Sequence, residues 1–355
     1  MSHRIAVIPG DGIGVEVIRE ATRLLTMLSE RRSLGLDLWQ LDLGAERFLR
    51  DGTTMPQAVF EEIRDTCSAI LMGAVGDPRV PSNQHAIDIL FGFRFGLELY
   101  ANIRPVRCLA DRLSPLKHFG EKDVDFVIFR ENTEGLYVNV GGQVRRGTPD
   151  EIAINEDINT RKGVERIIRA AFEFAAERGL TRVHMADKSN AMRHAHELWL
   201  RVFREVAKEY PAIQAVHAYV DAMAMYMVQD PASIQVIVTC NLFGDILTDI
   251  GAALQGGLGM AGSASLHPGK RIGLFEPVHG SAPPLAGKDV ANPFASFLTV
   301  GLMMSHLGHR ELETLIEDCI RACVQAGECT HDVGGALGTR AASEAFLTRI
   351  AARLA

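Results

Sequence analysis

The chain has 355 residues, of which 47% are hydrophobic and 23% are charged, and its formal net charge is −7 with a sequence pI near 6.0. This composition is typical of a globular protein and excludes a disordered or fibrous one. No dense run of lysine and arginine occurs, so we expect no nucleic-acid partner. The sequence has no signal-peptide pattern and no apolar stretch of membrane-spanning length, which predicts a cytosolic (cytoplasmic) protein with no membrane partner.

The six cysteines are scattered through the chain, and their spacings match no CxxC pair and no disulfide-rich scaffold. We expect them to be reduced thiols, mostly buried. They are Cys67, Cys108, Cys240, Cys319, Cys323 and Cys329.

The opening of the chain predicts a strand-loop-helix unit, with a short buried strand at 4–9, a glycine-rich loop at 10–14 and helical spacing of apolar residues at 15–30. Alternating strand and helix patterns continue along the chain. The strand patterns lie at 69–72, 126–129, 183–186 and 236–239, and the helical ones include 162–178 and 195–208. This alternation predicts an α/β protein with much parallel strand pairing, and the length indicates two lobes.

One segment does not fit the alternation. Residues 141–155 contain Gly141-Gly142 and Thr148-Pro149, which indicates an inserted loop or β-arm. Such an arm is often a dimerisation element.

Two glycine-rich stretches only partly match nucleotide-binding motifs. Residues 257–262 have the spacing of the dinucleotide fingerprint, but that motif needs a strand before it, whereas 245–254 has a helical pattern. Residues 279–288 differ from a phosphate-binding loop because six residues separate the glycines and Asp289 follows Lys288. A magnesium-dependent phosphotransferase therefore lacks its main motif.

The stretch NLFGDILTD at 241–249 follows an apolar strand, and a helix there would place Asp245 and Asp249 on one face. Like charges at this spacing repel by roughly a few tenths of a kcal/mol unless a cation lies between them. Two interpretations stay open, namely two solvated carboxylates or oxygen ligands for a hard ion such as Mg²⁺ or Mn²⁺.

Other charged residues lie near the ends of predicted elements, and each alone is typical of a surface or salt-bridge residue. Together, Arg94, Arg104 and Arg130 could hold a ligand with several carboxylates through forked hydrogen bonds. Lys188 could act as a base if nearby cations lower its pKa, and Tyr137 could deliver a proton.

Eight motifs occur in the order and approximate spacing of the β-decarboxylating dehydrogenases, and the likeness covers essentially the whole chain. The sequence therefore resembles the family of isopropylmalate, isocitrate, homoisocitrate and tartrate dehydrogenases. The motifs are IPGDGIGVEV at 8–17, GAVGDP at 73–78, YANIRPVR at 100–107, FRENTEGLY at 129–137, ADKSNAM at 186–192, YVDAMAMYMV at 219–228, TCNLFGDILTDIGAALQGGLG at 239–259 and FEPVHGSAP at 275–283.

The resemblance implies an α/β, two-lobed, isopropylmalate dehydrogenase-like fold with a shared central sheet, unlike the Rossmann type. A large cofactor-binding lobe would comprise 1–99 and 254–355. A small lobe for substrate binding and dimerisation would comprise 100–253, with the arm around 138–155. The family also implies a homodimer or a higher homo-oligomer.

The resemblance also implies roles for the charged residues. The three arginines match the positions that hold the substrate's carboxylates. Asp245 and Asp249, with Asp221 from the partner subunit, match the ligands of Mg²⁺ or Mn²⁺. Lys188, also from the partner, matches the base that acts on the substrate hydroxyl, and Tyr137 matches the acid that protonates the product carbon.

The family's cofactor loop resembles residues 279–291 here. Relatives that use NAD commonly have an aspartate after Gly-Ser-Ala-Pro, and NADP-dependent isocitrate relatives have Lys-Tyr, whereas this chain has Pro284-Leu285. The residues around 291 resemble the NAD group, so we expect NAD, with NADP as the alternative. The cofactor residues carried over are His279, Gly280, Ser281, Ala282, Pro284, Ala291 and Asn292.

The residues before Arg94 line the pocket for the substrate's variable group in this family. Ile87, Leu90 and Phe91 are apolar, where a third carboxylate would need cations or hydroxyls. This disfavours isocitrate and homoisocitrate and favours 3-isopropylmalate. The stretches RENTEG and KSN resemble tartrate and D-malate dehydrogenases too, so those substrates stay open, as does a non-catalytic regulatory subunit of a hetero-oligomeric dehydrogenase.

Overall fold

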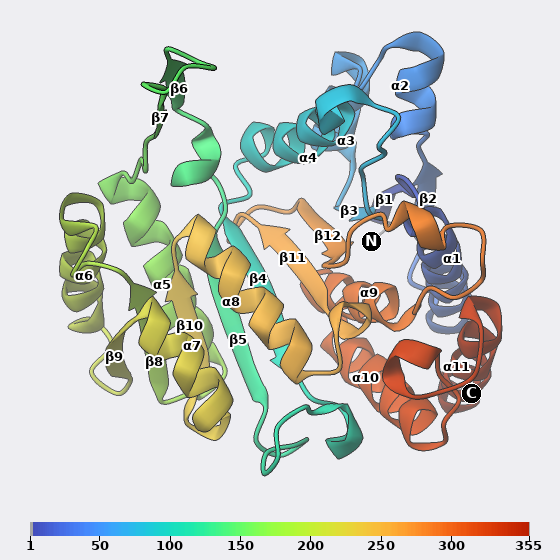
Figure 1. Ribbon diagram of the computed structural model, residues 1–355. Coiled ribbons are helices and arrows are strands. Elements are labelled where there is room, and N and C mark those ends of the chain that lie inside the picture. Colours follow the sequence, from blue (N-terminus) through green and yellow to red (C-terminus); the bar gives the residue numbers. More distant parts are fainter. Residues whose placement is uncertain (1–2, 355) are drawn as a thin grey trace. The chain divides into compact units, whose positions relative to one another are not determined.

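A computed structural model describes residues 3–354, and the chain divides into two compact units. Within the described residues, the first unit comprises 3–99, 105–124 and 252–354, and the second comprises 100–104 and 125–251. Residues 105–124 and 252–253, which the sequence analysis assigned to the small lobe, therefore lie in the first unit. Figure 1 colours the chain from its beginning to its end and labels the elements of both units.

The first unit contains a mixed sheet with strand order β2-β1-β3-β12-β11. Its strands are β1 (His3–Ile8), β2 (Leu36–Gln40), β3 (Ala69–Met72), β11 (Gly262–Leu266) and β12 (Gly273–Pro277). The pairs β1–β2, β1–β3 and β3–β12 are parallel, and β11–β12 is antiparallel. Strand β3 is buried along its whole length, and its sequence is accordingly apolar at every position.

Helices cover this sheet. The first of them begins at Ile13 with an acidic residue in its first turn, ends with two arginines in its last turn, and buries one apolar face. The helices are α1 (Ile13–Arg32), α2 (Ala45–Asp51), α3 (Gln57–Thr66), α4 (Gln84–Gly96), α9 (Phe294–His306), α10 (Arg310–Gln325) and α11 (Thr339–Leu354). Helix α9 is apolar nearly all round because it contacts α1, α10, β11 and β12.

The second unit contains a sheet with strand order β4-β5-β10-β8-β9. The pairs β5–β10, β10–β8 and β8–β9 are parallel. The strands are β4 (Ala101–Arg107), β5 (Asp125–Glu131), β8 (Arg182–Asp187), β9 (Gln214–Tyr219) and β10 (Val236–Thr239). Strand β4 begins in this unit and ends in the first one, where it follows β11 in the strand order.

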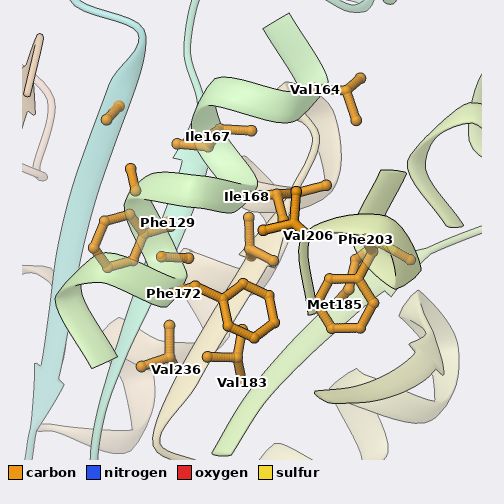
Figure 2. Close-up of a cluster of buried hydrophobic side chains, with 14 of the residues drawn as sticks. Phe129, Val164, Ile167, Ile168, Phe172, Val183, Met185, Phe203, Val206 and Val236 are labelled. Carbon is orange, nitrogen blue, oxygen red and sulfur yellow. The ribbon is translucent and has the colours of Figure 1, made fainter. Parts of the chain in front are cut away.

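The core of the second unit lies between its sheet and the helices α5 (Arg161–Glu177) and α6 (Arg193–Ala207). Figure 2 shows Phe172 of α5 and Phe203 of α6 among apolar side chains of the strands, such as Val183 and Val236. Two more helices, α7 (Val220–Gln229) and α8 (Asn241–Leu254), follow β9 and β10 directly. Parallel strands whose helices follow at the same sheet edge bring polar residues of several loops together.

Residues 141–155 form a two-stranded hairpin of β6 (Gly141–Val144) and β7 (Ile152–Asn155). Every residue of both strands is exposed, and Figure 1 shows the hairpin standing away from the sheet of its unit. A lone hairpin with apolar side chains on its surface is unstable in water without a further contact. Its part in dimerisation stays a prediction.

All six cysteines are free and buried, as predicted. Within residues 3–354, none of the helices has the length and apolar character that a membrane span requires. The cytosolic location stays a prediction.

Candidate active site

Arg130 is the central side chain of a polar cluster in the second unit. It lies near the end of β5 and is only 2% exposed. Its Nε and Nη2 donate to Asn241 Oδ1 at 3.0 and 2.8 Å, and its Nη1 donates to Asp245 Oδ1 at 2.5 Å. Glycine is required at position 244, because a Cβ there would lie 2.5 Å from Arg130 Cγ. The first turn of α8 thus packs directly on the arginine.

Tyr137 joins the same cluster from the short 3-10 turn Leu136–Val138. Its hydroxyl donates to Asp245 Oδ2 at 2.9 Å, and the Arg130 guanidinium lies 5.2 Å from the centre of its ring. Burial, together with the hydrogen bond to Asp245, raises the pKa of the phenol. The phenol therefore holds its proton at neutral pH, as a proton donor must.

Asp245 is ionised despite its surroundings. Burial acts to raise its pKa, but the charge of Arg130, the hydrogen bond from Tyr137 and the charge of Arg104 lower it, and the net shift is downward. Arg104, on β4, donates to Asn102 Oδ1 at 2.8 Å and to Thr248 Oγ1 at 2.6 Å. Arg104 and Arg130 are therefore both within electrostatic reach of one carboxylate.

The structure brings only two of the three predicted metal ligands together in one chain. Asp249 lies one turn after Asp245 on α8 and is exposed, with no side-chain hydrogen bond or ion pair to another residue of 3–354. Across the same residues, no group of three or more His, Cys, Asp or Glu side chains is arranged to hold a metal ion. Asp221, in the first turn of α7, is paired elsewhere.

The partner of Asp221 is Lys188, which follows β8. Lys188 Nζ donates to Asp221 Oδ2 at 2.7 Å, and this hydrogen bond lowers the pKa of the aspartate. The Asp221 side chain is 68% exposed, so the pair faces solvent. Solvent screens an exposed ion pair of this kind, so the pair is not a major source of stability.

The predicted substrate pocket belongs to the first unit. Arg94, near the end of α4, is buried, donates to Glu276 Oε1 at 3.0 Å and lies 6.0 Å from the ring centre of Phe91. Leu90 packs against the core of the unit, whereas Ile87 is exposed. Because Arg104 and Arg130 belong to the second unit, a clamp of three arginines stays a prediction.

The predicted cofactor loop also lies in the first unit. Ser281 O accepts a hydrogen bond from Ile13 N at 2.8 Å, and a Cβ at Gly12 would lie 2.0 Å from that oxygen, so the two loops touch. His279 is nine-tenths buried, and its Nε2 has no hydrogen-bond partner among residues 3–354. Burial lowers the pKa of His279. A buried polar atom without a partner is expected where a ligand supplies one.

The rest of this loop is held by the chain itself. Ala282 has a left-handed backbone with φ 38°, and Pro284 lies in the short 3-10 turn Pro283–Leu285. Ala291 O accepts from Thr339 Oγ1 at 2.6 Å. Asn292 Nδ2 donates to Asp332 Oδ2 at 3.0 Å, and its Oδ1 accepts from Phe294 N. These bonds fix the loop where it ends, at Ala291 and Asn292.

A buried carboxylate missed by the sequence analysis holds the glycine loop at 10–14. Asp11 Oδ1 accepts from Ala45 N at 2.7 Å, and its Oδ2 accepts from Gly76 N and contacts His85 Nε2, both at 2.8 Å. The residue had been interpreted only as part of a turn. No spacing rule signals it, since its partners come from three distant segments.

Another missed carboxylate supports the turn of Tyr137. Glu134 accepts hydrogen bonds from Thr160 N at 2.8 Å and Thr160 Oγ1 at 2.6 Å, at the beginning of α5. A Cβ at Gly163 would lie 2.2 Å from the Glu134 carboxylate carbon. The carboxylate therefore occupies the space beside a helix residue that has no side chain.

Residues 4–349 match the protein family described as isocitrate/isopropylmalate dehydrogenase. The chain belongs to this family. Among similar proteins, the 3-isopropylmalate dehydrogenase of Thermobifida fusca is 45% identical over 91% of both chains. That of Frankia casuarinae is 43% identical over 96% of this chain and 99% of its own.

Solved structures agree with this assignment. The isocitrate dehydrogenase of Methylococcus capsulatus is 34% identical, with a TM-score of 0.87 over 98% of this chain and 99% of its own. A β-decarboxylating dehydrogenase of Thermococcus kodakarensis is 35% identical, with a TM-score of 0.80 over 98% of this chain and 96% of its own. The predicted α/β fold, unlike the Rossmann type, is thus confirmed. This member of the isocitrate/isopropylmalate dehydrogenase family is a decarboxylating hydroxy-acid dehydrogenase.

Proposed function

We propose that the protein catalyses the NAD-dependent oxidative decarboxylation of a 3-substituted malate, with 3-isopropylmalate as its substrate. The observation that carries the proposal is the cluster of Arg130, Asp245 and Tyr137, in which one carboxylate lies 2.5 Å from a guanidinium and 2.9 Å from a protonated phenol. A cation for a substrate carboxylate, an anion for a metal ion and a proton donor are thus adjacent.

Asp245 and Asp249 suit a hard divalent cation, because ionised carboxylate oxygens are the ligands that Mg²⁺ and Mn²⁺ take. The low pKa of Asp245 supports this assignment. We infer that Asp221 of the partner subunit is the third ligand. When bound, the ion would lower the pKa of the substrate hydroxyl and stabilise negative charge on the product.

The loop at 279–292 is proposed to hold the nicotinamide cofactor, which accepts the hydride when bound. The unpaired buried Nε2 of His279 supports a ligand at this loop. Pro284 offers no acceptor for a ribose diol, so the choice of NAD rests on the likeness around Ala291 and Asn292. NADP is the alternative.

In the proposed reaction, Arg104 and Arg130 hold the carboxylates of the substrate, with Arg94 as the third member of the clamp. Proton transfer is proposed to involve two other residues, Lys188 and Tyr137. Lys188 of the partner subunit removes the proton of the hydroxyl as the hydride leaves. Carbon dioxide is then lost, and the Tyr137 phenol delivers a proton to the carbon that carried it.

A homodimer is proposed as the working unit, since Lys188 and Asp221 must reach the site of the other chain. Apolar residues exposed on α7 and on the hairpin support it, because such surfaces in a soluble protein usually mark contacts. They are Met225, Tyr226, Val228, Val144, Ile152 and Ile154.

The substrate is proposed from the apolar residues Ile87, Leu90 and Phe91 on α4, and from the 3-isopropylmalate dehydrogenases that are 43–45% identical to this chain. Tartrate or D-malate is the second candidate, favoured by the motifs at 130–135 and 188–190. A steady-state assay with Mn²⁺ that follows the absorbance of reduced cofactor tests both. It compares 3-isopropylmalate, D-malate, tartrate and isocitrate, each with NAD and NADP.

We expect the highest kcat/KM for 3-isopropylmalate with NAD, with one CO₂ released per reduced cofactor. A higher kcat/KM for D-malate or tartrate would replace the first candidate by the second. No turnover with any of the four acids would contradict the proposed function.

A further inference from the structure

A buried histidine lies directly behind the loop that carries Lys188. His196 is in the first turn of α6, and its side chain is 0% exposed. Its Nδ1 accepts a hydrogen bond from the backbone N–H of Lys188 at 3.0 Å. Because Nδ1 is the acceptor, the neutral ring carries its proton on Nε2.

The other ring nitrogen faces the carboxylate of Asp157. The distance from His196 Nε2 to Asp157 Oδ2 is 3.6 Å, and Nε2 has no hydrogen-bond partner among residues 3–354. A buried N–H left without a partner destabilises the folded state. Asp157 Oδ2 accepts from Asn159 Nδ2 at 2.8 Å, and Trp199 of α6 donates to Asn159 Oδ1 at 2.8 Å. A small movement of the ring toward Asp157 would therefore complete a partly buried network.

Asp157 is also close to the turn that carries Tyr137. Ile158 O accepts from Gly135 N at 2.7 Å, and a Cβ at Gly135 would lie 3.5 Å from Asp157 Oδ1. Gly135 comes two residues before Tyr137. The pair of His196 and Asp157 thus lies between the Lys188 loop and the Tyr137 turn within one chain.

We propose that His196 is a positioning residue for Lys188. Its Nδ1 fixes the backbone of Lys188, and its Nε2–H faces the carboxylate of Asp157 on the side of the Tyr137 turn. The proposal rests on the proposed function, in which Lys188 is the base of the partner's site and Tyr137 is the acid of its own site. The pair therefore links groups that serve two different active sites.

Two amide side chains separate the roles of the two ring nitrogens. In His196→Asn the amide oxygen lies close to the position of Nδ1 and can still accept from the Lys188 N–H. In His196→Gln the polar group lies close to Nε2, and the acceptor for Lys188 is lost. Trp199→Phe is the matched control, because it removes a hydrogen bond from the same helix without contacting Lys188.

The variants are compared in two measurements on the full-length enzyme, namely steady-state kinetics and hydrogen exchange of the Lys188 backbone amide. Loss of one hydrogen bond of about 1.4 kcal/mol corresponds to about a tenfold effect, so we expect His196→Gln to lower kcat and speed the exchange by about tenfold, with KM within about threefold. We expect kcat and the Lys188 amide exchange rate of His196→Asn to remain within about threefold of those of the unmodified enzyme. For Trp199→Phe we expect both values to remain within about twofold.

An equal fall in kcat in His196→Asn and His196→Gln would overturn the proposal, because only the volume of the ring would then matter. Unchanged exchange of the Lys188 amide in His196→Gln would overturn it too. If that variant does not fold, Asp157→Asn removes the charge that faces Nε2, and an unchanged kcat in it would overturn the proposal. Absence of dehydrogenase activity in the unmodified protein would contradict the proposed function instead, while the exchange data would still decide whether His196 holds Lys188.

Discussion

The two aspartates of α8 have different surroundings, so replacing each by asparagine should separate stability from metal dependence. Asp245 accepts hydrogen bonds from Arg130 and Tyr137, whereas Asp249 is exposed and has no side-chain partner among residues 3–354. Asparagine keeps the size of each side chain and removes one negative charge. We expect both variants to lose metal-supported turnover and only Asp245→Asn to lose stability.

The size of the stability effect follows from the partners of Asp245. A hydrogen bond between charged groups contributes about 1.5–3 kcal/mol, and Arg130 is only 2% exposed. The Asp245 side chain is 42% exposed, and an amide oxygen still accepts one bond, so we expect a loss of about 1–2 kcal/mol. Asp249→Asn removes only the repulsion between the two aspartates and should stabilise by about 0.2–0.5 kcal/mol.

A single tryptophan can report the unfolding of the second unit. The chain has 2 tryptophans, Trp39 in the first unit and Trp199, 1% exposed, in the second. In a Trp39→Phe background, the fluorescence of Trp199 follows urea unfolding in metal-free buffer. If the slope of the unfolding free energy against urea concentration is the same in both variants, their urea midpoints give the difference in stability. Turnover is measured in parallel over a range of Mn²⁺ concentrations.

Two results would refute this reasoning. If Asp245→Asn were as stable as its parent, or Asp249→Asn equally destabilised, the ion pair with Arg130 would not carry the expected free energy. If Asp245→Asn were fully active at low Mn²⁺, Asp245 would not be a metal ligand.

The remaining predictions concern the cofactor, the dimer and the pH dependence. Pro284→Asp should raise the ratio of kcat/KM for NAD to that for NADP, because a carboxylate accepts from the ribose diol and repels a 2′-phosphate; an unchanged ratio would show that this position does not control cofactor choice. Tyr137→Phe and Asp221→Asn should each be inactive, yet hybrid dimers of the two should regain up to half the activity per dimer, and background activity after proven subunit exchange would exclude a shared site. Burial lowers the pKa of His184 to about 4, so the His184 ring stays neutral in the folded state. In the unfolded state the same ring takes up a proton below about pH 6.5. The resulting stability is complete above pH 6.5 and falls by up to about 3 kcal/mol toward pH 4, and urea midpoints of His184→Leu should lack this part of the fall.

Elements with a strong local pattern could be predicted almost to the residue. The strands at 69–72 and 236–239 have the predicted bounds, and the first helix differs by two residues at each end. Strands β11 and β12 were not predicted. Ser263 and Ser265 are fully buried in β11, and a Cβ at Gly262 would lie 3.0 Å from the backbone of Thr299 in α9. In a sequence, small polar residues usually indicate a loop. Here they permit helix α9 to pack closely on strand β11.

Motif order singled out the charged residues proposed for the candidate site, but their pairings could not be predicted. Arg130 and Asp245 are separated by 115 positions in the sequence, and the Lys188–Asp221 pair by 33. A hydrogen bond between distant positions depends on tertiary packing, for which no spacing rule exists. His196 was not singled out for the same reason, since its ring contacts a backbone N–H, and a backbone group has no signature in a sequence.

The carboxylate of Glu134 beside Gly163 imposes a constraint on how this family can diverge. A side chain at 163 would collide with the carboxylate, and a shorter residue at 134 would leave Thr160 without its acceptor. The two positions should therefore change together across related sequences, as spatial neighbours often do. Selection would then act on the two positions as a pair, and a glycine at 163 would mark the relatives that keep the glutamate.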